Sequence, residues 1–295
     1  MDQIPRRFSR RARRRRNRLN TEGRTLSRAG RRTEALTHRL AAGMSVGSLR
    51  MPDKAARQDL RERRRRWEAM HADGREPFDY SHRAMEILRH ELVAATARHL
   101  VPADDATLLD VGCSRGQLTR RLATVARTVV AVDLSHAAAV ATRAELRAAR
   151  CRRSWVVVGS STALPFSAER VDLVVLSDGL HSWHLTRDER ALALGEAYRV
   201  TRRGGRALLT EFLNPQRFAR FVDEARASAF RIDTVEYLHD RLWYQFESWF
   251  KAVRHRAPVR RILRSLSLAR VLRILARPLG ARGSRHVCIV ASRAP

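Results

Sequence analysis

The sequence predicts an α/β protein whose mostly parallel sheet is covered by helices on both faces. From about residue 84 onward, short apolar runs of strand length alternate with segments of helical periodicity. The runs are apolar at nearly every position, which is typical of parallel strands buried on both faces. The chain of 295 residues is also long enough to bury a substantial core.

The predicted elements follow one another in a regular order. Strands are predicted at 107–111, 128–132, 155–158, 171–176, 206–211, 231–238 and 286–291. Helices are predicted at 84–100, 118–125, 136–150 and 189–200. Another helix is expected to start at Asn214. Asparagine is a favoured N-cap residue, and Pro215 suits the first helical position.

The charge is concentrated at the two ends of the chain. The formal net charge is +29, of which residues 1–75 carry +15, residues 76–250 carry +2 and residues 251–295 carry +12. A total of this size would by itself suggest nucleic-acid binding. Because residues 76–250 are nearly neutral, the excess positive charge indicates what the two ends of the chain bind. It says little about a reaction in the middle of the chain.

Composition excludes several classes of protein. The hydrophobic fraction of 44% excludes disorder throughout the chain, and no stretch has the 18 or more apolar residues that a membrane span requires. Three scattered cysteines, Cys113, Cys151 and Cys288, are too few for a disulfide framework or a zinc cluster. We therefore expect a cytoplasmic protein without a metal site.

Four regions are expected along the chain. Residues 1–75 form an Arg-rich, largely disordered extension, since residues 1–50 show runs of repelling charge and no apolar periodicity. A transit peptide, or a translation start at Met44, Met51 or Met70, stays open for this extension. The remaining regions are a core at 76–240, a helical basic insertion or lid at 241–283, and the last strand with the C-terminus at 284–295.

The insertion combines an aromatic cluster at 243–250 with arginine-rich segments of helical periodicity. Aromatic clusters are more often core than binding sites. Three interpretations of the basic helices over 251–279 stay open: an ordinary lid, an element that binds a membrane surface, or a surface that binds nucleic acid. The apolar residues between the arginines favour the membrane surface over nucleic acid.

One segment carries clear chemistry. Residues 108–116 read as a strand that enters a glycine turn and then a helix, with Gly112 and Gly116 four residues apart. Asp133 ends the next strand, where a carboxylate can accept the two hydroxyls of a ribose. The turn lacks the G-x-G-x-x-G spacing of nicotinamide and flavin sites. A nucleoside-containing cofactor of another kind is indicated.

Five segments together resemble the class I S-adenosylmethionine-dependent methyltransferases, in particular the small-molecule group typified by the quinone methyltransferases ("type 11"). They are LLDVGCSRG (108–116), VVAVDLS (129–135), GSSTALPF (159–166), VDLVVLSDGLHSW (171–183) and EAYRVTRRGGRALLTEF (196–212). The resemblance implies a Rossmann-like sheet of seven strands with a helical insertion before the last one. It also implies S-adenosylmethionine as the cofactor.

The resemblance assigns cofactor-binding roles to particular residues. The glycine motif around the amino-acid and ribose portions corresponds to Asp110, Gly112, Cys113, Ser114 and Gly116. Asp133 corresponds to the acid that binds the ribose hydroxyls, and Leu134, Ser161 and Thr162 correspond to residues beside the adenine. Ser177 corresponds to a residue beside the sulfonium, and Tyr80 to one that covers the cofactor. Ser114 replaces the middle glycine of the family motif, and Ser160 stands where an acidic residue is common.

Methyl transfer to a hydroxyl also needs a group that removes a proton. His181 and Glu211 are the candidates, because His181 follows one strand and Glu211 ends the next, and the carboxyl ends of strands face the ligand in open α/β sheets. Asp178 is expected to bond only its local backbone, and Cys113 to be a small apolar residue beside the turn.

The expected function is methylation of a small-molecule or lipid-like acceptor, with peripheral contact to an anionic membrane through 251–279. Two alternatives stay open. One is an RNA methyltransferase or nucleic-acid-binding protein that uses the basic ends, for which no RNA-binding module is evident. The other is a catalytically silent homologue that binds the cofactor.

Overall fold

A computed structural model describes residues 54–72, 74, 76–101, 105–181, 183–253 and 256–295. The chain divides into two units, 1–46 and 47–295, and every described residue belongs to the second. The predicted disorder of residues 1–50 and the candidate starts at Met44 and Met51 lie outside the described residues.

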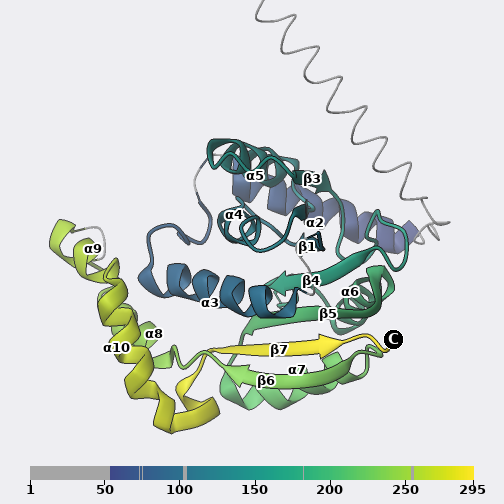
Figure 1. Cartoon of the computed structure of the whole chain (residues 1–295). Coiled ribbons are helices and arrows are strands. Elements are labelled where there is room, and N and C mark those ends of the chain that lie inside the picture. Colours follow the sequence, from purple (N-terminus) through teal and green to yellow (C-terminus); the bar gives the residue numbers. More distant parts are fainter. Residues whose placement is uncertain (1–53, 73, 75, 102–104, 182, 254–255) are drawn as a thin grey trace, which may run out of the picture. The chain divides into compact units, whose positions relative to one another are not determined.

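The seven predicted strands form one sheet with the order β3-β2-β1-β4-β5-β7-β6, shown in Figure 1. Only β7 runs antiparallel to its neighbours β5 and β6. This arrangement confirms the predicted Rossmann-like class. The strands are β1 (Thr107–Val111), β2 (Thr128–Asp133), β3 (Ser154–Val158), β4 (Val171–Ser177), β5 (Thr201–Phe212), β6 (Arg231–Tyr237) and β7 (His286–Ser292).

Strand β5 is longer than predicted and begins at Thr201 instead of residue 206. A side chain at Gly205 would place its Cβ 2.8 Å from the Thr201 side chain, so the strand bends tightly there. The pairing of β4 with β5 shifts register at the same place. Gly204 and Gly205, which directly precede the predicted strand, therefore lie inside an irregular strand.

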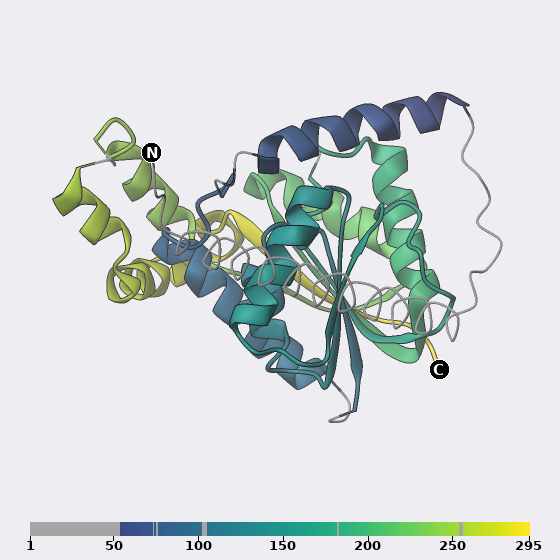
Figure 2. The ribbon, with the colours of Figure 1, turned by 90° about the horizontal axis from the view of Figure 1, so that it is seen from above.

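Helices cover both faces of the sheet (Figures 1 and 2). They are α2 (Lys54–Ala72), α3 (Ala84–Leu100), α4 (Gln117–Leu122), α5 (His136–Ala148), α6 (Arg187–Val200), η1 (Pro215–Arg217), α7 (Phe218–Arg226), α8 (Arg241–Trp249), α9 (Ala257–Leu263), α10 (Leu266–Ala276) and η2 (Arg277–Gly283). Asn214 is the N-cap residue of the short 3₁₀ turn η1 and Pro215 follows it at the first position, as predicted, but the Asn214 side chain makes no cap bond.

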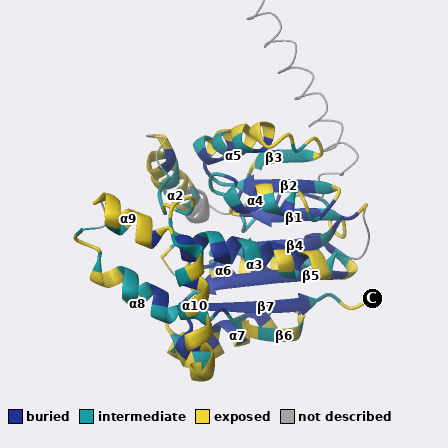
Figure 3. Ribbon diagram, turned by 60° about the vertical axis from the view of Figure 1, so that its left-hand side comes forward, coloured by how far each residue is buried: buried dark blue, intermediate teal, exposed yellow. Residues whose placement is uncertain are grey.

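The main core lies between the middle of the sheet and α3. Leu108, Leu173 and Leu208 come from β1, β4 and β5 and are completely buried. They belong to one apolar cluster with Val93 and Ala97 of α3. Figure 3 shows the central strands as buried along most of their length, as expected for strands covered on both faces.

The insertion between β6 and β7 has its own apolar cluster. Trp243 is fully buried and packs with Met85 and Leu88 of α3 and with Leu263 and Ala269 of the insertion. The interpretation of the aromatic residues as core is confirmed for this tryptophan. The cluster joins the insertion firmly to α3, which is itself part of the main core.

The prediction that residues 1–75 are largely disordered is wrong for 54–72, which form α2. The Glu68 carboxylate accepts hydrogen bonds from the hydroxyl of Ser135 and the backbone N–H of Ala137, at the start of α5. Arg63 forms an ion pair with Glu189 of α6. The partners that stabilise this arginine-rich helix lie far along the chain, so no local pattern reveals them.

Candidate active site

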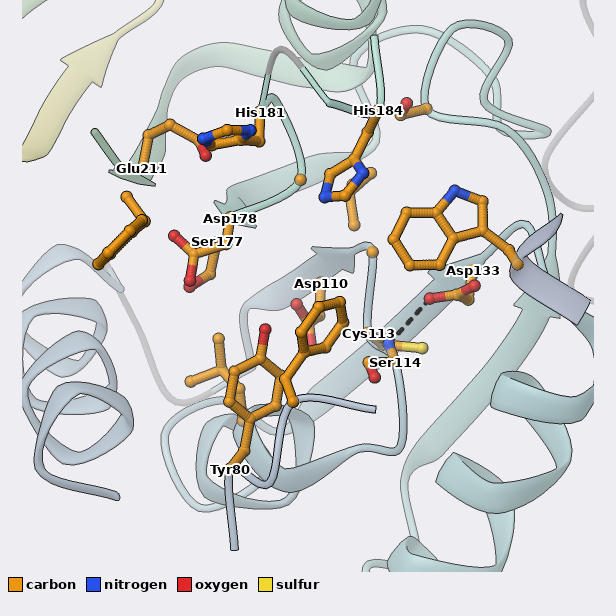
Figure 4. Close-up of a pocket in the computed structure, with 18 of the residues that line it drawn as sticks. Tyr80, Asp110, Cys113, Ser114, Asp133, Ser177, Asp178, His181, His184 and Glu211 are labelled. Atoms are coloured by element: carbon orange, nitrogen blue, oxygen red, sulfur yellow. Dashed lines mark hydrogen bonds between the residues drawn. The ribbon is translucent and has the colours of Figure 1, made fainter. Parts of the chain in front are cut away.

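A cavity of about 430 Å³ lies at the carboxyl ends of the parallel strands. Its walls include residues at the ends of β1, β2, β4 and β5 and the first residue of β7. Because β7 is antiparallel, it begins at the edge where the other strands end. Figure 4 shows how the side chains from these separate strands face one another.

The glycine turn after β1 is tied directly to β2. Gly112 has a φ of +83°, and the backbone N–H groups of Gly112 and Cys113 both donate to the carbonyl oxygen of Val132. Ser114 has a φ of +50°, a conformation that glycine adopts more easily. Its backbone N–H donates to Asp133 Oδ2 at 2.8 Å (Figure 4).

Two carboxyl groups face this half of the cavity. Each oxygen of Asp133 accepts one backbone N–H, from Ser114 and from Ser135, and can accept further bonds from a ligand. Burial raises the pKa of Asp133. Burial likewise raises the pKa of Asp110 to about 7, although the Thr119 hydroxyl donates to it at 2.6 Å. This pair suits a ribose diol and an ammonium group.

Most of the predicted cofactor residues meet at the cavity. Those that line it are Tyr80, Asp110, Gly112, Cys113, Ser114, Asp133, Leu134, Ser161 and Ser177. Gly116 and Thr162 are not among the described residues of its wall. A Cβ at Gly116 would lie 2.9 Å from the Thr142 side chain, so this glycine allows α4 to approach α5. The Thr162 hydroxyl bonds to that of Ser160 at 2.8 Å.

Cys113 is a buried thiol, as predicted. Its Sγ lies 3.5 Å from the Thr142 hydroxyl, and burial raises its pKa well above the usual range. A thiol held in its neutral form is a poor nucleophile.

The other half of the cavity contains a buried arginine that the sequence did not reveal. Arg89 of α3 donates to the Ser177 hydroxyl at 2.6 Å and to Glu86 at 2.9 Å, and it pairs with Asp178 Oδ2 at 3.0 Å. The expectation that Asp178 bonds only local backbone is therefore wrong. Burial would raise its pKa, but the charges of Arg89 and His286 hold it well below the usual range.

His286 is a second residue that the sequence analysis missed. Its Nδ1 donates to Asp240 Oδ2 at 2.5 Å, and its Nε2 lies 3.5 Å from Asp178 Oδ2. Burial alone would lower the pKa of His286, but these two carboxylates raise it to about 9. The imidazole is therefore positively charged at pH 7.

The pKa values of the two predicted proton acceptors are shifted in opposite directions. Glu211 is buried, and its Oε2 accepts the backbone N–H of Leu180 at 3.0 Å. Burial and the charge of Asp178 raise its pKa well above the usual range, which favours the protonated carboxyl. His181 Nδ1 accepts the backbone N–H of Trp183 at 3.1 Å. Burial lowers its pKa, so the imidazole is unprotonated at pH 7.

Sequence signals existed for some of the missed residues. Arg63, Trp67 and His71 all line the cavity and recur every fourth residue along α2, the spacing of one helix face. His286 opens the last predicted strand, and the reversal of that strand places it at the site. Nothing local identifies Arg89 or Asp240, whose partners are distant in sequence.

Comparison with known sequences identifies the domain. Residues 109–209 match the sequence model of a family described as a methyltransferase domain. Over 117 residues, the chain is 38% identical to the ubiquinone/menaquinone biosynthesis C-methyltransferase UbiE of Dinoroseobacter shibae, covering 38% of this chain and 45% of that protein. A demethylmenaquinone methyltransferase of Renibacterium salmoninarum is 33% identical over 110 residues, 37% of this chain and 42% of that protein. The chain thus spans less than half the length of these relatives.

Solved structures share the fold at lower sequence identity. The [4+2]-cyclase SpnF superposes with a TM-score of 0.52 at 20% identity, covering 71% of this chain and 82% of that one. A geranyl diphosphate methyltransferase in complex with GPP and sinefungin gives a TM-score of 0.51 at 20% identity, covering 71% and 79%. A cyclase among the neighbours illustrates that this fold alone does not decide the reaction. The matched domain, the sheet order and the glycine motif agree with one another: residues 109–209 are similar to a methyltransferase domain, and the sheet that contains them has the fold of the class I S-adenosylmethionine-dependent methyltransferases.

Proposed function

We propose that the protein transfers a methyl group from S-adenosylmethionine to a small-molecule or lipophilic acceptor. One observation carries the proposal: a single cavity joins the glycine turn and Asp133 to a buried polar cluster around Asp178, Glu211 and His286. A cofactor and an acceptor can therefore meet inside the same enclosed space. The similarity to quinone methyltransferases supports a small acceptor.

The residues of the first half fit the cofactor. Asp133 has a free lone pair on each oxygen for the two ribose hydroxyls, and Asp110 would be ionised by a nearby ammonium group. Gly112 lines the cavity next to these two carboxyl groups, and because it has no side chain its backbone is open to the cofactor. When bound, S-adenosylmethionine supplies an electrophilic methyl group on its sulfonium.

The second half offers the acceptor both aromatic surface and polar contacts. Tyr80, Phe212 and Tyr244 line it together with the carboxyl groups of Asp178 and Glu211. For a hydroxyl acceptor, the proposal gives His181 the proton-accepting role, because it is unprotonated at pH 7. Glu211, whose raised pKa favours the protonated form, would then hold the acceptor through a hydrogen bond.

Calorimetric titration with S-adenosylmethionine and with NADH tests the cofactor. We expect the first to bind, and binding of NADH alone would overturn the assignment. The acceptor can then be sought by incubating the protein with methyl-labelled cofactor and a small-molecule extract of the host, with RNA as a parallel substrate. Label in the extract supports the proposal, label only in RNA supports the nucleic-acid alternative, and tight binding without label supports a silent homologue.

We further propose that α10 and η2 contact an anionic membrane surface. Val271, Ile274, Leu275 and Leu279 are between 51% and 60% exposed, although Ala269 and Ala276 of the same segment are fully buried. Residues 251–295 contain 12 basic and no acidic residues. An apolar stripe flanked by arginines fits an anionic bilayer better than a phosphate backbone. None of the helices in the described parts of the chain has the length and apolar content of a membrane span.

Co-sedimentation with vesicles of phosphatidylcholine and phosphatidylglycerol tests this contact. The double variant Ile274→Ser/Leu275→Ser should lose about tenfold or more in vesicle binding, because two apolar side chains no longer leave water. Leu192→Ser on α6, where Leu192 is 57% exposed, is the matched control. Equal binding of the double variant and the control would contradict the contact, as would salt-sensitive binding to RNA without binding to vesicles.

A further inference from the structure

We propose that helix α2 completes the cofactor-binding site, with Trp67 and His71 as binding residues beyond those of the glycine motif. The inference rests on the proposed function, because it concerns the same cofactor. Neither residue belongs to the matched domain at 109–209. Both line the cavity, on the side of the glycine turn.

Helix α2 presents one face to the cavity. Arg63, Trp67 and His71 are spaced by four residues and all line it, whereas Arg64, Arg65 and Arg66 between them are exposed. His71 is only 3% exposed although it lies in the last turn of the helix. A helix packed merely for stability would not need to direct an indole and an imidazole at a ligand cavity.

His71 contacts the part of the turn where the motif departs from its family. Its Nδ1 donates to the carbonyl oxygen of Trp67 at 2.9 Å, and its Nε2 lies 3.2 Å from the Ser114 hydroxyl. Ser114 is the residue that replaces the middle glycine, and its backbone N–H holds Asp133. His71 also lowers the pKa of Asp133, which burial otherwise raises. The imidazole thus supports the carboxylate that faces the ribose.

Trp67 lies beside His71, with ring centroids 6.1 Å apart. Its ring packs against His184 with a centroid distance of 4.6 Å and an edge-on angle of 63°. His184 follows β4, and burial lowers its pKa to about 4, so the two rings form a neutral aromatic wall. Figure 4 shows His184 on the other side of the cavity from Tyr80. Such a wall suits the flat, apolar face of a nucleoside.

Contacts with two other helices hold α2 over the cavity. Glu68 binds the Ser135 hydroxyl and the Ala137 N–H of α5, and Arg63 pairs with Glu189 of α6. In Figure 2, where α2 is purple, it lies as a separate helix outside the sheet. Because α5 and α6 follow β2 and β4, these contacts span the strands whose ends frame the cavity. The chain N-terminal to the matched domain therefore supplies part of the binding wall.

Calorimetric titration of the full-length protein with S-adenosylhomocysteine tests the inference without requiring turnover. We expect Trp67→Ala to weaken binding by 10-fold or more and His71→Ala by about 5-fold, on the scale of one lost aromatic contact and one lost hydrogen bond. The matched controls are Trp249→Ala and His82→Ala, whose side chains are exposed and lie outside the cavity wall. The controls should bind as the wild type does.

Two further measurements keep the result interpretable if Trp67→Ala unfolds α2. Trp183 also lines the cavity, so fluorescence is measured in a Trp183→Phe background. Ligand binding should change the fluorescence there, and Trp67→Phe should remove that change while Trp249→Phe keeps it. In a Ser114→Gly background, His71→Ala should cost less affinity than in the wild type, because the partner hydroxyl is gone.

The outcomes separate this inference from the proposed function. Wild-type binding together with unchanged affinity and unchanged fluorescence response in the Trp67 and His71 variants overturns the role of α2 and leaves the proposed function intact. No binding of S-adenosylhomocysteine to the wild type overturns both.

Discussion

The half of the cavity around Asp133 comes mainly from one short stretch of chain, whereas the half around Asp178 is assembled from distant segments. In the first half, Gly112, Ser114 and Asp133 lie within 22 consecutive residues and are joined by backbone hydrogen bonds. In the second, Arg89 and His286 meet Asp178 from α3 and from the last strand. A binding motif can be local, but a buried cluster of charges needs partners that only folding supplies.

The two halves also differ in how they balance charge. The first leaves two carboxyl groups with raised pKa values facing the cavity, a condition that a cationic or hydroxyl-bearing ligand relieves. The second pairs Glu86, Asp178 and Asp240 within the protein, through Arg89 and His286, although the pKa of Glu211 is also raised there. We therefore expect substitutions in the second half to affect stability most, and those in the first half to affect ligand binding most.

The largest effect is expected from Asp240→Ala. Asp240 is fully buried and accepts hydrogen bonds from His286 Nδ1 and from the backbone N–H of Arg285. Removing it takes the nearer of two carboxylates from the buried His286 cation, which costs about 3–5 kcal/mol of unfolding free energy. Urea denaturation measures the loss. As a control, Asp233→Ala removes a carboxylate paired with the exposed Arg231 and should cost less than about 1 kcal/mol.

A smaller effect is expected from pH. The pKa of His286 is about 9 in the folded protein, above the ordinary value of 6.5. Its contribution is therefore fully present below pH 6.5 and is lost as the pH rises through 9, an effect on the order of 3 kcal/mol. The unfolding free energy of the wild type should fall over this range more steeply than that of His286→Gln. Parallel curves for the two proteins would refute this account of the cluster, and His82→Gln should follow the wild type.

The smallest of the three effects, and the one that sharpens the contrast, is expected from Asp133→Asn. The amide keeps the shape but loses the charge and one acceptor oxygen. Affinity for S-adenosylmethionine should fall about 10- to 100-fold, on the scale of one or two hydrogen bonds to a charged group. Calorimetry gives the affinity. Thermal unfolding should show a loss of stability smaller than that of Asp240→Ala, because one backbone N–H loses its acceptor. Asp223→Asn, at an exposed position on α7, serves as the control. A large loss of stability with unchanged affinity would reverse the roles of the two halves.

Sequence reasoning recovered the strands because their apolar runs are unambiguous, and it recovered Asp133 because strand ends and glycine turns are local features. It missed α2, whose run of arginines suggested disorder. Five exposed or partly exposed arginines can be tolerated there because Arg63 reaches Glu189 and Glu68 reaches α5. It also assigned Asp178 only local bonds, because the arginine that pairs with it lies 89 residues earlier.

By itself, the sequence determined the α/β class, the order of the strands along the chain and the cofactor motif, because periodicity, glycine turns and strand-end carboxylates act over a few neighbouring residues. The tertiary structure decided which buried charges meet: Arg89 with Asp178, and Asp240 with His286. The reversed last strand brings His286 to the edge where the parallel strands end. Burial then sets the charge of each group, so the polar half of the cavity exists only once the sheet has formed.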